Sequence, residues 1–140
     1  MSNVEMTQSA LEAACDAAML KGFTVIEDND YTLLLDLDNP EALAVFNINL
    51  TILQQHLEVV VHDRWPSKSS TKIYPHEHVV LKLGNPLTQV RRFALQAFLG
   101  SDPRRELLNC LGFCFWGVVG GNVLFKPAPV PETSDDDIPF

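Results

Sequence analysis

The spacing of apolar and polar residues predicts helices and strands along most of the chain. Residues 4–21 are rich in alanine, and their apolar positions fall on one helical stripe that ends before Gly22. Residues 23–26 and 31–37 are short apolar runs on either side of a polar turn. We therefore expect an N-terminal helix followed by a β-hairpin.

Two periodicities overlap in the next segment. Pro40 stands where it could open a helix, because a proline is well tolerated in the first helical turn. A strict period of two, however, runs through the apolar residues Phe46, Ile48, Leu50 and Ile52. Because alternate residues of a strand share one face, we assign residues 45–53 to a strand with one polar face.

The pattern then changes from strands to helices. Apolar runs predict two more strands, and the polar residues between them predict a loop. Gly84-Asn85-Pro86 ends the second of these strands, and helical spacing of apolar residues follows it. The predicted elements are strands at residues 57–62 and 77–83, a polar loop at residues 63–75, and helices at residues 87–99 and 104–110.

A second hairpin is predicted late in the chain. Gly120-Gly121 is a good two-residue turn between strands at residues 113–119 and 122–125. The order of elements favours an α+β domain, in which an N-terminal helix and one or two later helices pack on a mostly antiparallel sheet. We assign residues 1–126 to this single globular domain.

Residues 127–140 have a different composition. They contain the prolines Pro127, Pro129, Pro131 and Pro139 and no basic residue. Prolines at this density prevent regular structure and favour an extended chain, so we expect a flexible tail that holds its end away from the domain.

Composition limits the classes of protein to consider. The chain has 140 residues, of which 46% are hydrophobic and 20% charged, as in one ordinary globular domain. It has no apolar stretch of the ~20 residues that cross a bilayer, and its acidic start is no secretory signal. We expect a cytoplasmic protein, in which Cys15, Cys110 and Cys114 stay reduced as small core residues.

The tail ends in a short acidic and apolar segment, Asp135, Asp136, Asp137, Ile138, Pro139 and Phe140. Three consecutive carboxylates must stay in water or meet a basic surface, because burial of an unpaired charge is very costly. Ile138 and Phe140 offer apolar side chains, and the α-carboxylate lies on the residue that carries the terminal ring. Such a segment suits a partner pocket with an apolar floor and a basic rim.

These six residues resemble the C-terminal tip of bacterial single-stranded-DNA-binding proteins, which ends in Asp-Asp-Asp-Ile-Pro-Phe. In that family the tip recruits replication, recombination and repair proteins, so the resemblance implies the same partners here. It covers 6 of 140 residues, and the family's N-terminal strand pattern is not found. The family would imply an oligonucleotide-binding barrel, which is the alternative fold for the domain.

One loop has the composition of a site for single-stranded DNA. Arg64, Lys68 and Lys72 could follow the phosphates, while Trp65 and Tyr74 could stack on bases. The alternative is an ordinary solvated loop in which Trp65 covers the edge of the sheet. Arg91 and Arg92 on the predicted helix are second-rank candidates for DNA contact, although adjacent arginines are commonly just an exposed face.

The net charge of −8 neither proves nor excludes DNA binding. Four of the 18 acidic residues lie in the tail, so residues 1–126 carry 14 acidic and 10 basic residues and are moderately acidic. Any DNA-binding surface must therefore be a local cluster of basic groups.

The sequence offers little sign of catalysis or of metal binding. His76 and His78 would share one face of a strand, but a zinc site normally needs three or four ligands. No glycine-rich phosphate loop appears, and neither Cys110 nor Cys114 has a polar setting that would activate it. We expect no enzyme, no cofactor and no metal.

Two functions follow from these observations. The first is a nucleoid-associated, single-stranded-DNA-binding protein of a phage or mobile element, which recruits replication, recombination and repair proteins through its tip. The second is an adaptor or inhibitor that does not bind DNA and occupies the same partners with its tip. The loop with Trp65 favours the first, and the small number of basic residues favours the second. A homo-oligomer is compatible with either function.

Overall fold

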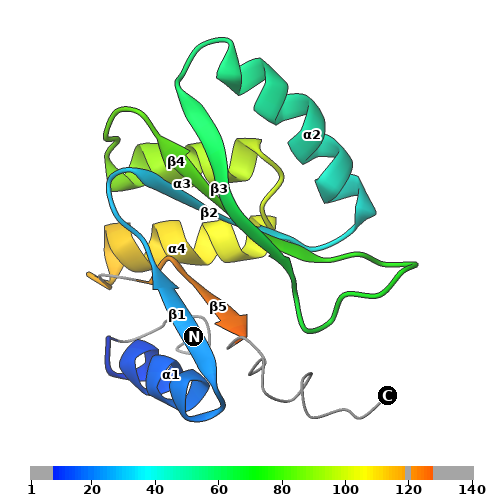
Figure 1. Cartoon of the computed structure of the whole chain (residues 1–140). Coiled ribbons are helices and arrows are strands. Elements are labelled where there is room, and N and C mark those ends of the chain that lie inside the picture. The colour runs from blue at the N-terminus through cyan, green and yellow to red at the C-terminus, as the bar shows by residue number, and fades with distance from the viewer. Residues whose placement is uncertain (1–7, 119–120, 128–140) are drawn as a thin grey trace, which may run out of the picture.

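The computed structural model describes residues 8–118 and 121–127, which form four helices and five strands (Figure 1). In chain order these elements are α1 (Gln8–Leu20), β1 (Phe23–Glu27), β2 (Thr32–Leu37), α2 (Pro40–Gln54), β3 (Val59–Pro66), β4 (Glu77–Leu83), α3 (Gln89–Phe98), α4 (Pro103–Phe115) and β5 (Val123–Pro127).

All strand pairs within these ranges are antiparallel. β4 lies between β2 and β3 in a three-stranded sheet, and β1 pairs with β5 in a separate two-stranded sheet. The α+β class and the N-terminal helix are therefore confirmed. The described strands do not close into the alternative barrel.

The three-stranded sheet is covered on both faces, which explains the continuous apolar run of β2. Leu33, Leu35 and Leu37 belong to the main core, in which Phe46 of α2 and Leu99 after α3 are also buried. Leu34 points to the opposite face and joins a smaller core with Trp65, Val80 and Leu124. The helix α1 lies at the other end of the molecule, beside β1 (Figure 1).

The strand predicted over residues 45–53 is wrong, because this segment belongs to helix α2. Asn39 caps the helix through a hydrogen bond from the backbone N–H of Ala42, and Pro40 occupies the first turn. The side chains that pack on the sheet recur at helical spacing: Ala42, Leu43, Phe46, Leu50 and Leu53. Ile48 and Ile52, two members of the alternating set, are instead exposed.

Both predicted hairpins are also wrong. β1 and β2 do not pair with each other, because β1 pairs with β5, nearly 100 residues later, and β2 pairs with β4. The helix predicted at residues 104–110 continues to Phe115, so residues 113–115 are not part of a strand. Residues 119–120 of the predicted turn lie outside the described residues.

The strand predicted at residues 57–62 is longer than expected. β3 begins at Val59 and continues to Pro66, which places Arg64 and Trp65 in the sheet rather than in a loop. A register shift between Val61 and Asp63 marks a bulge, which changes the face on which the following residues lie. The prediction of residues 77–83 as a strand is confirmed.

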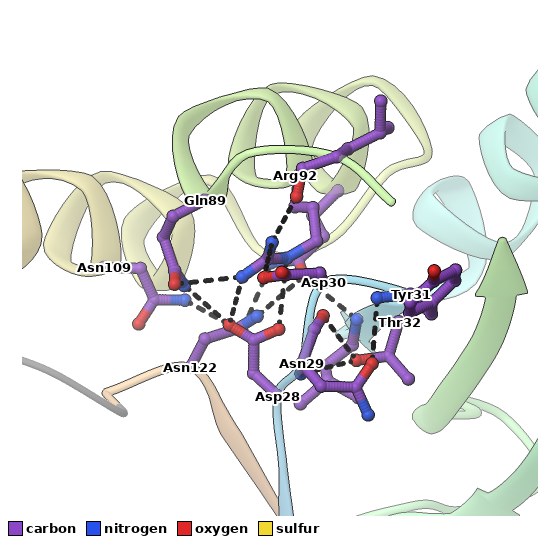
Figure 2. Close-up of polar contacts among 12 residues, drawn as sticks. Asp28, Asn29, Asp30, Tyr31, Thr32, Gln89, Arg92, Asn109 and Asn122 are labelled. Atoms are coloured by element: carbon purple, nitrogen blue, oxygen red, sulfur yellow. Dashed lines mark hydrogen bonds and ion pairs between the residues drawn. The ribbon is translucent and has the colours of Figure 1, made fainter. Parts of the chain in front are cut away.

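A buried ion pair joins α3 to the turn that connects β1 and β2 (Figure 2). Arg92 donates from Nε and Nη2 to the two carboxylate oxygens of Asp28, at 3.2 and 3.1 Å. Its Nη1 donates to the carbonyl oxygen of Leu87 and to Asp30. The Arg92 and Asp28 side chains are only 3% and 5% exposed, so this guanidinium belongs to the interior.

We predict that Arg92→Ala destabilises the fold by about 3–5 kcal/mol, because it leaves the Asp28 carboxylate buried without its partner. Arg91→Ala is the matched control, since Arg91 is exposed on the same helix and its loss should change the unfolding free energy by less than about 0.5 kcal/mol. Urea unfolding of both variants measures the difference. Equal stabilities would contradict the structural role of Arg92.

Candidate functional site

The structure separates the seven predicted DNA-binding residues. Lys68, Lys72 and Tyr74 lie on the exposed loop between β3 and β4, and Arg64 is at the end of β3 beside that loop. Arg91 is exposed on α3, a separate element, while Arg92 is buried in its ion pair with Asp28. The expectation that Arg92 offers its charge at the surface is therefore wrong.

Trp65 is a core residue, which contradicts its predicted exposure on a loop. Its residue surface is only 7% exposed, and its indole Nε1–H donates to the carbonyl oxygen of Phe125 at 3.3 Å. The ring meets His78 edge-on at a centroid distance of 5.6 Å, and the Lys126 ammonium lies 5.4 Å from its centroid. In this arrangement the indole supports the contact between the two sheets, and its low exposure leaves little surface on which a base could stack.

Arg64 is exposed, but its charge is already matched. Its Nε and Nη2 donate to the two carboxylate oxygens of Glu77, at 2.9 and 2.8 Å. This bidentate contact with Glu77 raises the pKa of Arg64, although partial burial opposes the increase. A phosphate would have to compete with Glu77 for this guanidinium.

The loop from Ser67 to His76 is held by its own hydrogen bonds. Ser67 N–H donates to the carbonyl oxygen of His76, and Thr71 N–H donates to that of Tyr74. Lys68 and Lys72 are exposed and have no carboxylate within ion-pair distance in the described part of the chain. Tyr74, which is 60% exposed, offers an aromatic ring on the same loop.

A cleft of about 620 Å³ lies between α1, β5 and the end of the three-stranded sheet. One wall is apolar and comes from α1, β1, β3 and β5: Ala14, Ala17, Ala18, Phe23, Trp65, Phe125 and Pro127. The polar lining comes from Lys21, Asp36, Asp38, Ser67, Lys68, Ser69 and His78. This volume is in the range of pockets that bind small molecules or peptide side chains.

Two carboxylates of the cleft lie beside histidines. Asp36 Oδ1 is 3.4 Å from His78 Nε2, and Asp38 Oδ1 is 3.6 Å from His76 Nδ1. Burial acts to raise the pKa of Asp36, but its contact with His78 and the nearby charges of Arg105 and His76 lower it more, so its pKa is below the ordinary value. Burial and the charges of Asp36 and Asp102 raise the pKa of Asp38.

This cleft was not identified from the sequence. Helical spacing placed the apolar residues of the first helix on one stripe, but within α1 only Leu11 is buried, and Ala14 and Ala18 line the cleft. The stripe of small residues was the available signal, because alanines leave space beside a helix. Without the pairing of β1 with β5, nothing in the sequence brings this helix to Trp65 and Phe125.

The predicted interaction tip, residues 135–140, lies outside the described residues. None of the described helices has the length and apolar character that crossing a membrane requires. Within residues 8–118 and 121–127, no three histidine, cysteine or acidic side chains are grouped so that they could hold a metal ion. Comparison with protein-family models, with known proteins and with solved structures found no match to this chain.

We predict that Trp65→Ala lowers the unfolding free energy by about 3–5 kcal/mol, because it removes a large buried ring and leaves a cavity between the two sheets. Tyr74→Ala, which removes an exposed ring from the adjacent loop, should change it by less than about 0.5 kcal/mol. Chemical unfolding followed by circular dichroism measures both. A Trp65→Ala protein as stable as the parent would contradict the burial of the indole.

Proposed function

We propose that this protein is an adaptor that presents the acidic tip of residues 135–140 to replication, recombination and repair proteins. The observation that carries the proposal is the tip itself, which combines three carboxylates with two apolar side chains in the order found in single-stranded-DNA-binding proteins. The partner supplies an apolar pocket for Ile138 and Phe140 and a basic rim for the carboxylates. The proposed setting is the cytoplasm, near the nucleoid.

The charges of residues 1–126, which we call the body, support an adaptor over a DNA-coating protein. Four of the ten basic residues are engaged in ion pairs within the body: Arg64, Arg92, Arg105 and Lys126. Binding to single strands relies on basic groups that can replace counterions along the phosphates. A moderately acidic body with so many of its cations already paired is poorly suited to that task.

We predict that deletion of Phe140 weakens binding to a purified protein that recognises the tip of single-stranded-DNA-binding proteins by about thirtyfold or more. A loss of ~2 kcal/mol is typical when an aromatic anchor is removed from its pocket. Glu132→Gln is the control, because it removes a tail charge outside the tip. Isothermal titration calorimetry measures both affinities.

The fold should be unaffected by this deletion, which an unchanged melting temperature would show. A synthetic Asp-Asp-Asp-Ile-Pro-Phe peptide should compete with the full chain for the partner. If the deletion leaves the affinity unchanged, or if the peptide does not compete, the adaptor function is wrong.

The loop between β3 and β4 supports a second candidate, which is binding of single-stranded DNA. Lys68 and Lys72 are exposed without ion pairs, and Tyr74 offers an exposed ring on which a base could stack. This arrangement keeps three of the seven predicted DNA-binding residues together. It lacks the indole of Trp65, which is the stronger stacking surface in the sequence.

For this candidate we predict that Lys68→Glu combined with Lys72→Glu abolishes retention of a fluorescent oligonucleotide at low salt. Arg104→Glu combined with Lys82→Glu is the charge-matched control, because both residues are exposed on other elements. Fluorescence anisotropy over a range of salt concentrations measures the affinity, which should fall as salt increases. A parent protein that retains no oligonucleotide at low salt would leave only the adaptor function.

A further inference from the structure

Helix α2 carries a second apolar stripe, which remains exposed. Val45, Ile48 and Ile52 follow one another at spacings of three and four residues, so they lie on one side of the helix. Their residue surfaces are 40%, 64% and 43% exposed. Figure 1 shows α2 at the periphery of the molecule. The alternating apolar pattern of this segment therefore reflects two faces of a helix, one packed on the sheet and one open to solvent.

Phe98 of α3 adds to this stripe. Asn49, which lies between Val45 and Ile52 on the same side of α2, donates from Nδ2 to the carbonyl oxygen of Phe98 at 2.7 Å. This hydrogen bond places the end of α3 beside the stripe, and Phe98 is itself 41% exposed. Large apolar side chains that are exposed together on adjoining elements are typical of a protein–protein contact. We call Val45, Ile48, Ile52 and Phe98 the α2 surface.

The absence of charge along α2 selects the partner of this surface. Residues 42–55 contain no acidic or basic residue, whereas the whole chain has a net charge of −8. Two copies of the chain repel each other least where an uncharged stretch meets its equivalent. A highly charged partner is disfavoured, because its charges would lose hydration against apolar side chains without gaining a counter-charge. A second copy instead offers an apolar stripe of the same length and spacing.

We propose that two copies of this chain associate through the α2 surface, with their α2 helices antiparallel about a two-fold axis near Ile48 and Ile52. Spacings of three and four residues let the side chains of one helix fit between those of the other. Antiparallel packing also opposes the two helix dipoles, and it places the two Glu41 side chains at opposite ends of the contact. The contact contains no tail residue, so the inference is independent of the proposed function.

The size of this contact predicts a weak dimer. A helix of 15 residues is about 22 Å long, so side-by-side packing of two such helices buries on the order of 1,000 Å² in total. This area is at the lower end of the range for specific protein interfaces, so we expect a dissociation constant on the order of micromolar. The dimer should therefore form and dissociate within an accessible range of protein concentration.

The first test measures the mass of the full chain by sedimentation equilibrium between about 1 and 500 µM, a range that brackets a contact of this size. The mass should rise from 15.6 kDa to twice that value. Ile48→Glu should weaken the dimer at least about a hundredfold, because it buries two like charges close together. Ile73→Glu is the control, since Ile73 is 83% exposed on the loop between β3 and β4 and the same charge there should leave the dimer intact.

Three outcomes of this test would overturn the proposal. The parent chain could remain at 15.6 kDa at every concentration, its mass could continue to rise beyond that of a dimer, or Ile48→Glu could dimerise as well as the parent. Because Ile48 is exposed, Ile48→Glu should keep the melting temperature that the parent shows at low concentration. An unchanged melting temperature assigns the loss of the dimer to the contact and not to the fold.

The second test asks whether the α2 surface meets its own copy. Ile48→Glu and Ile48→Lys should each be monomeric alone, because like charges meet near the axis. An equimolar mixture should regain the dimer, because the opposite charges attract across the axis. Added salt should weaken the dimer of the mixture but not that of the parent. A mixture that stays monomeric would show that α2 packs on a different surface and would reject the two-fold arrangement.

Discussion

The outer edge of β2 is hydrogen-bonded to side chains instead of to another strand. These hydrogen bonds constrain where the helices α3 and α4 lie relative to the sheet. The Leu34 backbone donates to Gln96 and accepts from Arg105, while the Asp36 N–H donates to Ser101 Oγ. An uncovered edge would expose backbone groups that can pair with other chains. Here the segment from α3 to α4 provides those hydrogen bonds, so it must lie beside β2.

The carboxylate of Glu106 holds these covering side chains in place. It is 4% exposed and accepts hydrogen bonds from Ser101, Arg105 and Gln96 at 2.6 to 2.7 Å. A buried charge is tolerated only when it is fully matched, so the geometry around Glu106 is narrowly fixed. Asn122, immediately before β5, joins the same network and thereby sets where β5, the wall of the cleft, begins.

Elements with one dominant periodicity could be predicted from the sequence, whereas their pairing could not. The strand at residues 77–83 and the helices around Leu11 and Phe93 were found because their apolar spacing is unambiguous. α2 was mistaken for a strand because its apolar residues satisfy both periods, and only packing on the sheet decides between them. The pairing of β1 with β5 depends on contacts about 100 residues apart, which no local turn signal indicates.

The same distinction explains how far the candidate sites could be predicted. The proposed interaction tip consists of six consecutive residues, so its prediction requires no knowledge of the fold. A DNA-binding surface depends on which cations remain unmatched, and that is a property of tertiary structure. Arg92 and Arg64 are equivalent to other arginines in the sequence, yet Asp28 and Glu77 neutralise them through contacts 64 and 13 residues apart. Counting basic residues therefore overestimates the charge that this body can offer to phosphates.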